Sequence, residues 1–281
     1  MTGIKAHTIR IWEKRYNIVD PKRTESNIRY YDDEDLKKLL NVSILHKHGF
    51  KISKIANLNE SQLNEKISEV SRVDTDFDCQ IEGLVVAMID LNEAKFDKII
   101  NTAILNLGFE DTIFKIIYPF FNKVGVLWQT GAINPAQEHF ISNLIKLKLM
   151  VAIDNQSPAE KTGKKFMLFL PEWEFHEIGL LINYYLIKKQ GHGVLYLGQA
   201  VPHEDLEPVA AKYKPDCLVT SLTASVKPDR ITDLLSLIGE MFPQVTTYVS
   251  GRFATSLKSI LPSNVVLLEN VDEFKQIISN H

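Results

Sequence analysis

The chain has 281 residues, of which 45% are hydrophobic and 24% charged, and its formal net charge is −3 at pH 7. This length favours two or three domains, because domains typically run about 100 to 200 residues. The apolar runs fall short of the roughly 20 residues that a membrane-spanning helix needs. Cys79 and Cys217 lack Cys-x-x-Cys spacing, which argues against a disulfide framework and a thiolate zinc site. We therefore expect a globular cytoplasmic protein with no membrane partner.

The first 30 residues are basic, although the whole chain is acidic. They hold seven Lys and Arg residues against three acidic residues, a local charge of +4, as expected of a segment that contacts nucleic acid. A helical pattern over residues 5–17 is followed by a turn-rich loop over 21–27, a β-prone run over 28–31 and a second helix over 32–49. The predicted order is helix, basic hairpin-like wing, helix.

This segment resembles the MerR family of transcription regulators. The family's recognition-helix pattern Thr-Ile-Arg-x-Trp-Glu stands at residues 8–13, its wing pattern Arg-x-Tyr at 29–31 and its Ile-Ser-Lys-Ile pattern at 52–55. The resemblance implies a winged helix-turn-helix domain over residues 1–72. It also implies that the protein binds a double-stranded DNA operator as a homo-oligomer, either a dimer or a tetramer.

The resemblance also indicates which side chains contact DNA. Phosphate contacts are expected from Arg10, Lys14, Arg23 and Arg29, and base-edge contacts from His7, Thr8 and Asn27. The family pattern has a strand and a first helix before the turn at residues 2–4, where this sequence begins. We therefore expect the domain as written to lack its first helix, through a start-site assignment or a truncation, and to bind DNA more weakly for that reason.

The middle segment, residues 73–160, shows helical periodicity throughout. Its four apolar stripes cover residues 76–91, 94–105, 109–127 and 136–153. Four such helices joined by short breaks predict an antiparallel four-helix bundle. Trp128 follows the third helix, and Glu138 and His139 lie on the first turns of the fourth. Taken alone, Trp128 reads as a core aromatic and His139 as an ordinary hydrogen-bonded histidine.

The C-terminal segment, residues 161–281, alternates strand-like runs with helical patterns. The strand-like runs are 166–170, 193–196, 217–221, 247–250 and 265–268, and the helical patterns are 178–189, 204–213, 228–241, 255–261 and 271–279. This alternation predicts a doubly wound parallel sheet with five strands in the flavodoxin-like, or Rossmann-like, order. No Gly-x-Gly-x-x-Gly follows the first strand, so a dinucleotide is not the expected ligand.

A histidine lies at the turn between the first of these strands and the helix after it. His176 lies outside the carboxyl end of strand 166–170, where open α/β sheets bind ligands. Glu174, two residues earlier, can hold one ring nitrogen and leave the other for a metal. On these residues alone, a solvated loop histidine is an equally good interpretation.

Three loops that face this crevice resemble the cobalamin-binding signature. The matching residues are Glu174-x-His176-x-x-Gly179, Ser221-Leu-Thr223 and Ser250-Gly251, at the family's separations. In the bundle, Trp128 is followed after nine residues by Glu138-His139, which resembles the lid pattern of light-responsive regulators of the CarH and LitR type.

This second resemblance implies a cofactor, cobalamin, in the form of adenosylcobalamin. Cobalt would take His176 as its lower ligand, and Glu174 would orient the ring. The nucleotide tail would pass the loops that contain Gly179, Ser221, Thr223, Ser250 and Gly251, while Trp128, Glu138 and His139 would cover the upper face. Adenosylcobalamin would set subunit association and hence DNA binding, and light would reverse the effect in a photoreceptor.

Two residues depart from the family pattern. Gln129 stands where the light-responsive regulators have a histidine, and Ser250 stands in place of the first glycine of a Gly-Gly pair.

The sequence leaves three hypotheses for the function. The leading hypothesis is a cobalamin-binding transcription regulator that is not an enzyme. The second is a MerR-type regulator whose sensor domain has lost cobalamin and responds to a protein or another ligand. The third is a corrinoid enzyme module, which the MerR-type segment argues against.

Overall fold

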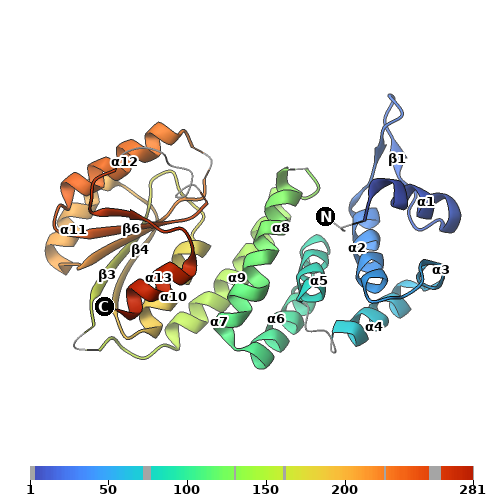
Figure 1. Cartoon of the computed structure of the whole chain (residues 1–281), viewed down its shortest axis with the longest axis horizontal. Coiled ribbons are helices and arrows are strands. Elements are labelled where there is room, and N and C mark those ends of the chain that lie inside the picture. Colours follow the sequence, from blue (N-terminus) through green and yellow to red (C-terminus); the bar gives the residue numbers. More distant parts are fainter. Residues whose placement is uncertain are drawn as a thin grey trace. The chain divides into compact units, whose positions relative to one another are not determined.

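The structure is a computed structural model that describes residues 4–71, 77–129, 131–160, 163–224, 226–252 and 261–280. The chain forms two compact units, Met1–Leu144 and Ile145–His281. Figure 1 shows the elements of both units in chain order, from blue to red. Within the described ranges, none of the helices combines the length and the apolar character needed to span a lipid bilayer.

The first unit begins with the expected helix, wing and helix. These elements are α1 (Ala6–Tyr16), β1 (Lys22–Arg23), β2 (Arg29–Tyr30) and α2 (Asp33–Lys47), and Figure 1 shows the hairpin projecting beyond the helices. The Asp32 side chain caps α2 by accepting a hydrogen bond from the amide of Asp35. The predicted winged order is confirmed, except that Lys22–Arg23 forms a strand inside the segment expected to be loop.

Two further helices, α3 (Ile52–Ile55) and α4 (Glu60–Ser71), complete this domain and were not predicted as elements. A capping box marks the start of α4, because Asn59 and Gln62 each accept a hydrogen bond from the other's backbone amide. This signal was present in the sequence. The core of the domain packs Trp12 of α1 against Leu39, Val42 and Leu45 of α2.

The four predicted bundle helices are confirmed. They are α5 (Asp78–Ile89), α6 (Glu93–Leu107), the continuous run α7 (Phe109–Thr112), η1 (Ile113–Ile117) and α8 (Tyr118–Gln129), and finally α9 (Pro135–Asp154). Asn92 caps α6, and Gly108, at φ +82°, separates it from α7. The middle of the third helix is a π-helical turn, over η1. The last helix, α9, crosses from the first unit into the second.

The second unit contains the predicted doubly wound sheet. Its strands are β3 (Lys165–Pro171), β4 (Gly193–Val201), β5 (Cys217–Ser221), β6 (Thr246–Ser250) and β7 (Val265–Leu267), all parallel, in the order β4-β3-β5-β6-β7. Its helices are α10 (Ile178–Lys189), η2 (His203–Asp205), α11 (Leu206–Tyr213), α12 (Pro228–Met241) and α13 (Val271–Ser279). The helix expected over residues 255–261 falls almost wholly outside the described residues.

This topology explains where a ligand can bind. Figure 1 shows α10 and α13 on one face of the sheet and α11 and α12 on the other. The strand order reverses between β3 and β5, so the chain leaves β3 and β4 toward opposite faces. The crevice at such a switch point lies outside the carboxyl ends of the strands. The loops after β3, β5 and β6 therefore meet at one edge.

Candidate functional site

Glu174 and His176 form a hydrogen-bonded pair in the loop after β3. The Oε1 atom of Glu174 accepts hydrogen bonds from the His176 backbone amide at 2.9 Å and from ring atom Nδ1 at 2.6 Å. The Glu174 side chain is fully buried, whereas the His176 side chain is 59% exposed. A buried carboxylate thus fixes an imidazole that faces outward.

The second oxygen of Glu174 joins two loops of the sheet edge. Its Oε2 atom accepts the backbone amides of Thr223 and Ala224, after β5, at 2.6 Å each. Burial raises the pKa of Glu174, but the hydrogen bonds from His176, Ala224 and Thr223 outweigh burial, so the pKa lies below its ordinary range. The ionised carboxylate is therefore the stable form at neutral pH.

This arrangement selects one tautomer of His176. An ionised carboxylate can only accept, so Nδ1 carries the ring proton and the lone pair of the neutral imidazole lies on Nε2. Metal-ligating histidines commonly use their second nitrogen to donate to a carboxylate in this way. The donor set therefore suits a metal that takes one imidazole nitrogen and approaches from solvent.

Gly179 and Ser221 meet beside this pair. A Cβ atom built on Gly179, in the first turn of α10, would lie 2.7 Å from Ser221 Oγ at the end of β5. Only glycine allows this approach without a shift of the helix or the serine. Gly251, at φ +105°, packs as closely on the backbone of Leu222, since its Cβ would lie 2.4 Å from the Leu222 carbonyl oxygen.

Ser250 lies on the same side of the site and is hydrogen-bonded to Asn183, a residue that was not predicted from the sequence. The Asn183 amide donates to Ser250 Oγ at 3.0 Å, and Ser250 Oγ donates to the Thr220 carbonyl at 3.3 Å. Asn183 is buried and lies one helical turn after Gly179, on the same face of α10. That spacing of four residues was the available signal.

The proposed upper-face residues belong to the first unit. Trp128, near the end of α8, is 54% exposed, so it is not the core aromatic that its sequence context alone suggested. The Glu138 carboxylate on α9 pairs with His139 Nδ1 at 2.7 Å and accepts a hydrogen bond from Ser142 Oγ at 2.5 Å. The His176 group lies in the second unit.

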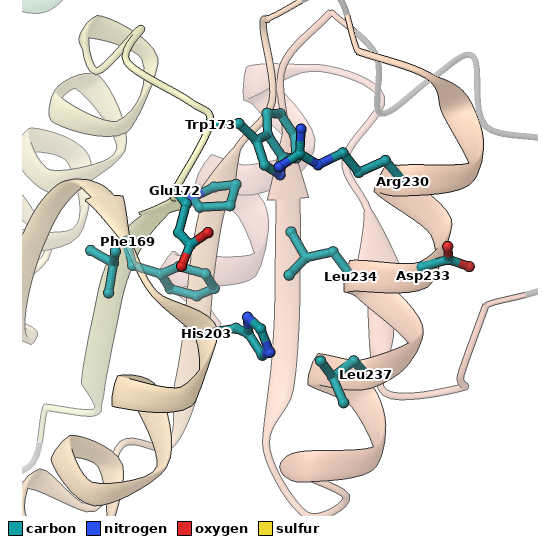
Figure 2. A pocket seen from close by; sticks show the side chains of 10 residues that line it. Phe169, Glu172, Trp173, His203, Arg230, Asp233, Leu234 and Leu237 are labelled. Carbon is teal, nitrogen blue, oxygen red and sulfur yellow. The ribbon is translucent and has the colours of Figure 1, made fainter.

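A separate pocket of about 240 Å³ opens beside the same β3 loop, on the α12 face of the sheet. Figure 2 shows its walls: Phe169, Glu172, Trp173 and His203 on one side, and Arg230, Asp233, Leu234 and Leu237 of α12 on the other. The Arg230 guanidinium lies over the Trp173 ring at 5.6 Å from the centroid. Glu172, His203 and Glu204 form an exposed cluster at its edge. No sequence motif pointed to this pocket.

The predicted DNA-contacting residues lie on α1 and the wing. His7, Arg10 and Lys14 are exposed on α1, and Thr8 is partly buried. The Arg29 guanidinium pairs with the Glu13 carboxylate of α1 at 3.1 Å and so joins the wing to that helix.

At the tip of the wing, Arg23 donates to Asn27 Oδ1 at 2.7 Å. A pocket of about 260 Å³ lies beside the start of α1, lined by Ile4, Lys5, Thr8, Trp12, Ser43, His46 and Lys47.

Comparison with known families assigns two segments of the chain, both almost wholly within the first unit. Residues 1–62 match the MerR HTH family of regulatory proteins, and residues 80–152 match the B12 binding domain. The chain is a MerR-type regulator with a cobalamin-binding domain. The MerR-type segment, the cobalamin-binding segment and the function of a cobalamin-binding transcription regulator, all expected from the sequence, are thereby confirmed.

Two relatives match this chain along most of their length. The chain is 26% identical over 267 residues to the HTH-type transcriptional repressor CarH of Myxococcus xanthus, covering 92% of this chain and 89% of that protein. It is 25% identical over 237 residues to the repressor CarA of the same organism, covering 84% and 78%. The monomethylamine corrinoid protein of Methanosarcina barkeri has a similar fold, with a TM-score of 0.55 and 19% identity over 70% of this chain and 95% of that one.

Proposed function

We propose that adenosylcobalamin is the regulatory ligand, that His176 Nε2 is the lower ligand of its cobalt, and that the bound cofactor controls self-association and operator binding in the cytoplasm. The observation that carries the proposal is the buried Glu174 carboxylate, which fixes the tautomer and direction of an outward-facing histidine. The relatives CarH and CarA are transcriptional repressors, which supports a regulator rather than an enzyme.

The remaining residues divide between the two faces of the cofactor. Gly179, Ser221, Thr223, Ser250 and Gly251 would flank the nucleotide tail, because they line one sheet edge beside α10. Trp128, Glu138 and His139 would cover the upper face from residues 73–160, and residues 161–281 would hold the lower face. Residues 1–72 would bind DNA through Arg10, Lys14, Arg23 and Arg29, with His7, Thr8 and Asn27 at base edges.

Light response is the part of the proposal that Gln129 bears on. When bound, adenosylcobalamin supplies a light-sensitive cobalt–carbon bond. The family's histidine after the lid tryptophan is Gln129 here, and an amide is a weak ligand for cobalt compared with an imidazole. We therefore expect that illumination reverses the effect of the cofactor on self-association and DNA binding, and that no second histidine then binds the cobalt.

The test uses the apoprotein mixed with adenosylcobalamin in the dark. The expected results are a shift of the visible absorption band and an earlier elution volume, both lost in His176→Ala and both kept in the control His203→Ala. Protein labelled with ¹⁵N-histidine and loaded with cob(II)alamin should show nitrogen hyperfine coupling in its EPR spectrum. Binding by His176→Ala with an unchanged EPR spectrum would contradict the assignment of the lower ligand.

A second function keeps the DNA-binding role but replaces the ligand. It is favoured by the Asn183–Ser250–Thr220 hydrogen bonds, which already connect α10 to the strands β5 and β6 where a nucleotide tail would pass. In this case a protein or another small molecule would act on the sensor domain. DNA binding that does not respond to cobalamin, in a protein that shows no absorption shift, would identify this alternative.

A further inference from the structure

Helix α5 is buried on every side. Every residue from Ile81 to Ile89 is buried, as is Cys79. A bundle helix that meets only its own bundle keeps a polar face toward solvent, whereas a helix that is apolar all round must be covered all round. Helix α2 of the DNA-binding domain packs against α5 and supplies that cover.

One face of α2 matches this role. Lys37, Leu40, Ile44 and Lys47 follow one another at spacings of three and four residues, so they lie on one stripe of the helix. Leu40 and Ile44 are 0% and 2% exposed, yet they lie outside the core cluster around Trp12. The stripe is therefore an apolar centre with a lysine at each end.

Both lysines pair with acidic residues at the two ends of α5. Lys37 contacts Asp90, just after α5, at 3.0 Å, and Lys47 contacts Asp78 at 2.8 Å, in the first turn of α5. These pairs require the two helices to run antiparallel along their length. We call this contact the α2–α5 interface.

A buried carboxylate joins this interface to the rest of the bundle. Glu82 is 1% exposed, and its Oε1 atom contacts Lys47 of α2 at 3.2 Å and Lys123 of α8 at 3.4 Å. Its Oε2 atom has no hydrogen-bond partner among the described residues. A buried ion pair of this kind adds little net stability over apolar packing, whereas removing one partner leaves an uncompensated buried charge. The Glu82 ion pairs thus favour the arrangement that brings Lys47 and Lys123 to this carboxylate, without adding much to the stability of the contact.

A second connection comes from the start of α9. The Gln137 amide donates to Asp33 of α2 at 3.2 Å and to the Ile89 carbonyl of α5 at 3.3 Å. Gln137 directly precedes Glu138 and His139, and Lys123 lies on the same helix as Trp128. The two helices that carry the proposed upper-face residues are therefore the ones that contact the interface.

We propose that the α2–α5 interface is a releasable contact through which the cofactor-binding bundle holds the DNA-binding domain, with Gln137 and the Glu82 ion pairs transmitting cofactor occupancy from α9 and α8. The proposal rests on the proposed function for the identity of the ligand. A shift of either helix at its upper-face end changes the Gln137 or Lys123 contact and so changes how firmly α2 is held.

The first experiment tests the interface without cofactor, by hydrogen exchange in α5. Lys37→Asp and Asp90→Lys should each speed exchange at residues 81–89 by about tenfold, equivalent to about 1.4 kcal/mol, and the double variant Lys37→Asp/Asp90→Lys should restore most of the protection. The control Lys115→Asp breaks a bundle ion pair with Asp111, at 2.7 Å, and should leave α5 unchanged. Failure of the charge swap to restore protection would overturn the interface.

The second experiment tests transmission, with adenosylcobalamin added in the dark. Wild-type protein should change its exchange at residues 81–89 and in α2 by about threefold or more. Gln137→Ala should lose that response while still binding the cofactor. Gln156→Ala is the matched control, because Gln156 lies just after α9 and its amide donates to the Ala152 carbonyl of that helix at 2.9 Å. A response that survives Gln137→Ala overturns the role of Gln137.

Absorption separates failure of the two proposals. No absorption shift on mixing would refute the proposed ligand, and the charge-swap result would still decide the interface. An absorption shift with no change of exchange in α2 or α5 would refute transmission alone.

Discussion

Replacing Glu174 with glutamine separates its geometric role from its charge. The carboxylate accepts four hydrogen bonds, two at Oε1 from His176 and two at Oε2 from the amides of Thr223 and Ala224. A glutamine has one oxygen and one NH2 group, so it cannot accept at both positions. If the oxygen faces Thr223 and Ala224, the NH2 group faces the backbone amide of His176, donor against donor.

The expected cost follows from that mismatch. Each polar group left without a partner in a buried setting costs about 1–3 kcal/mol, and the bonds that remain lose the strengthening that a charged acceptor provides. We therefore expect Glu174→Gln to lower the free energy of unfolding by about 2–4 kcal/mol. The NH2 group would also donate to His176 Nδ1, which moves the ring proton to Nε2 and removes the lone pair that cobalt would use.

Urea unfolding at pH 7 measures the loss, with Glu172→Gln as the control. Glu172 lies two residues earlier in the same loop and is exposed, so its change should stay within about 0.5 kcal/mol. A loss below about 1 kcal/mol for Glu174→Gln would show that the four hydrogen bonds to the carboxylate do not all contribute, because the amide left without an acceptor should alone cost that much.

The free energy of unfolding should also depend on pH through the ionisation of Glu174. Hydrogen bonding holds the pKa of Glu174 below its ordinary value of 4.5. The stabilisation is therefore present above pH 4.5 and is lost as the pH falls through the lower folded pKa. The difference in the free energy of unfolding between wild type and Glu174→Gln should therefore become smaller over that acidic range.

Three further predictions concern other parts of the chain. Gly179→Ala should destabilise by about 1–3 kcal/mol in urea, because its Cβ would meet Ser221 Oγ, and adding Ser221→Ala should recover most of the loss. Arg10→Ala should lower the salt dependence of binding to a 30-base-pair duplex by about 0.9 in log–log slope, whereas Lys66→Ala should not. Burial raises the pKa of Cys217 to about 11, so this thiol should react with a disulfide reagent at pH 8 on the order of 100 times slower in native than in unfolded protein.

Periodicity was enough to predict most of the fold. The five strands are short apolar runs bounded by turns, and the bundle helices show longer apolar stripes at helical spacing, so run length and spacing separate strand from helix. Helix α4 was not predicted because its sequence signal is a capping box rather than an apolar stripe. Asn59 and Gln62 each accept a hydrogen bond from the other's backbone amide, at the start of a mostly polar segment. A search for caps as well as stripes finds it.

The candidate site was harder to predict, because its decisive contacts join loops that are far apart in the sequence. Spacing suggested Glu174 as the residue that orients His176, but nothing in the sequence indicates that the second oxygen binds Thr223 and Ala224, some 50 residues later. Asn183 could be reached by helical spacing from Gly179. Its bond to Ser250 could not, because that bond depends on the order in which β5 and β6 pair.

These contacts divide the site into a part that is ready for a ligand and a part that must rearrange. Glu174 holds His176 with a full set of hydrogen bonds, so a metal can take Nε2 without disturbing the loop. A nucleotide tail passing between α10 and β6 must replace the Asn183–Ser250 bond, which is already made within the protein. The ligand's gain there is reduced by the bond it breaks. Under the proposed function, Ser250 would therefore decide affinity and the choice between cobalamin and another ligand, while Glu174 would set the direction from which His176 meets the metal.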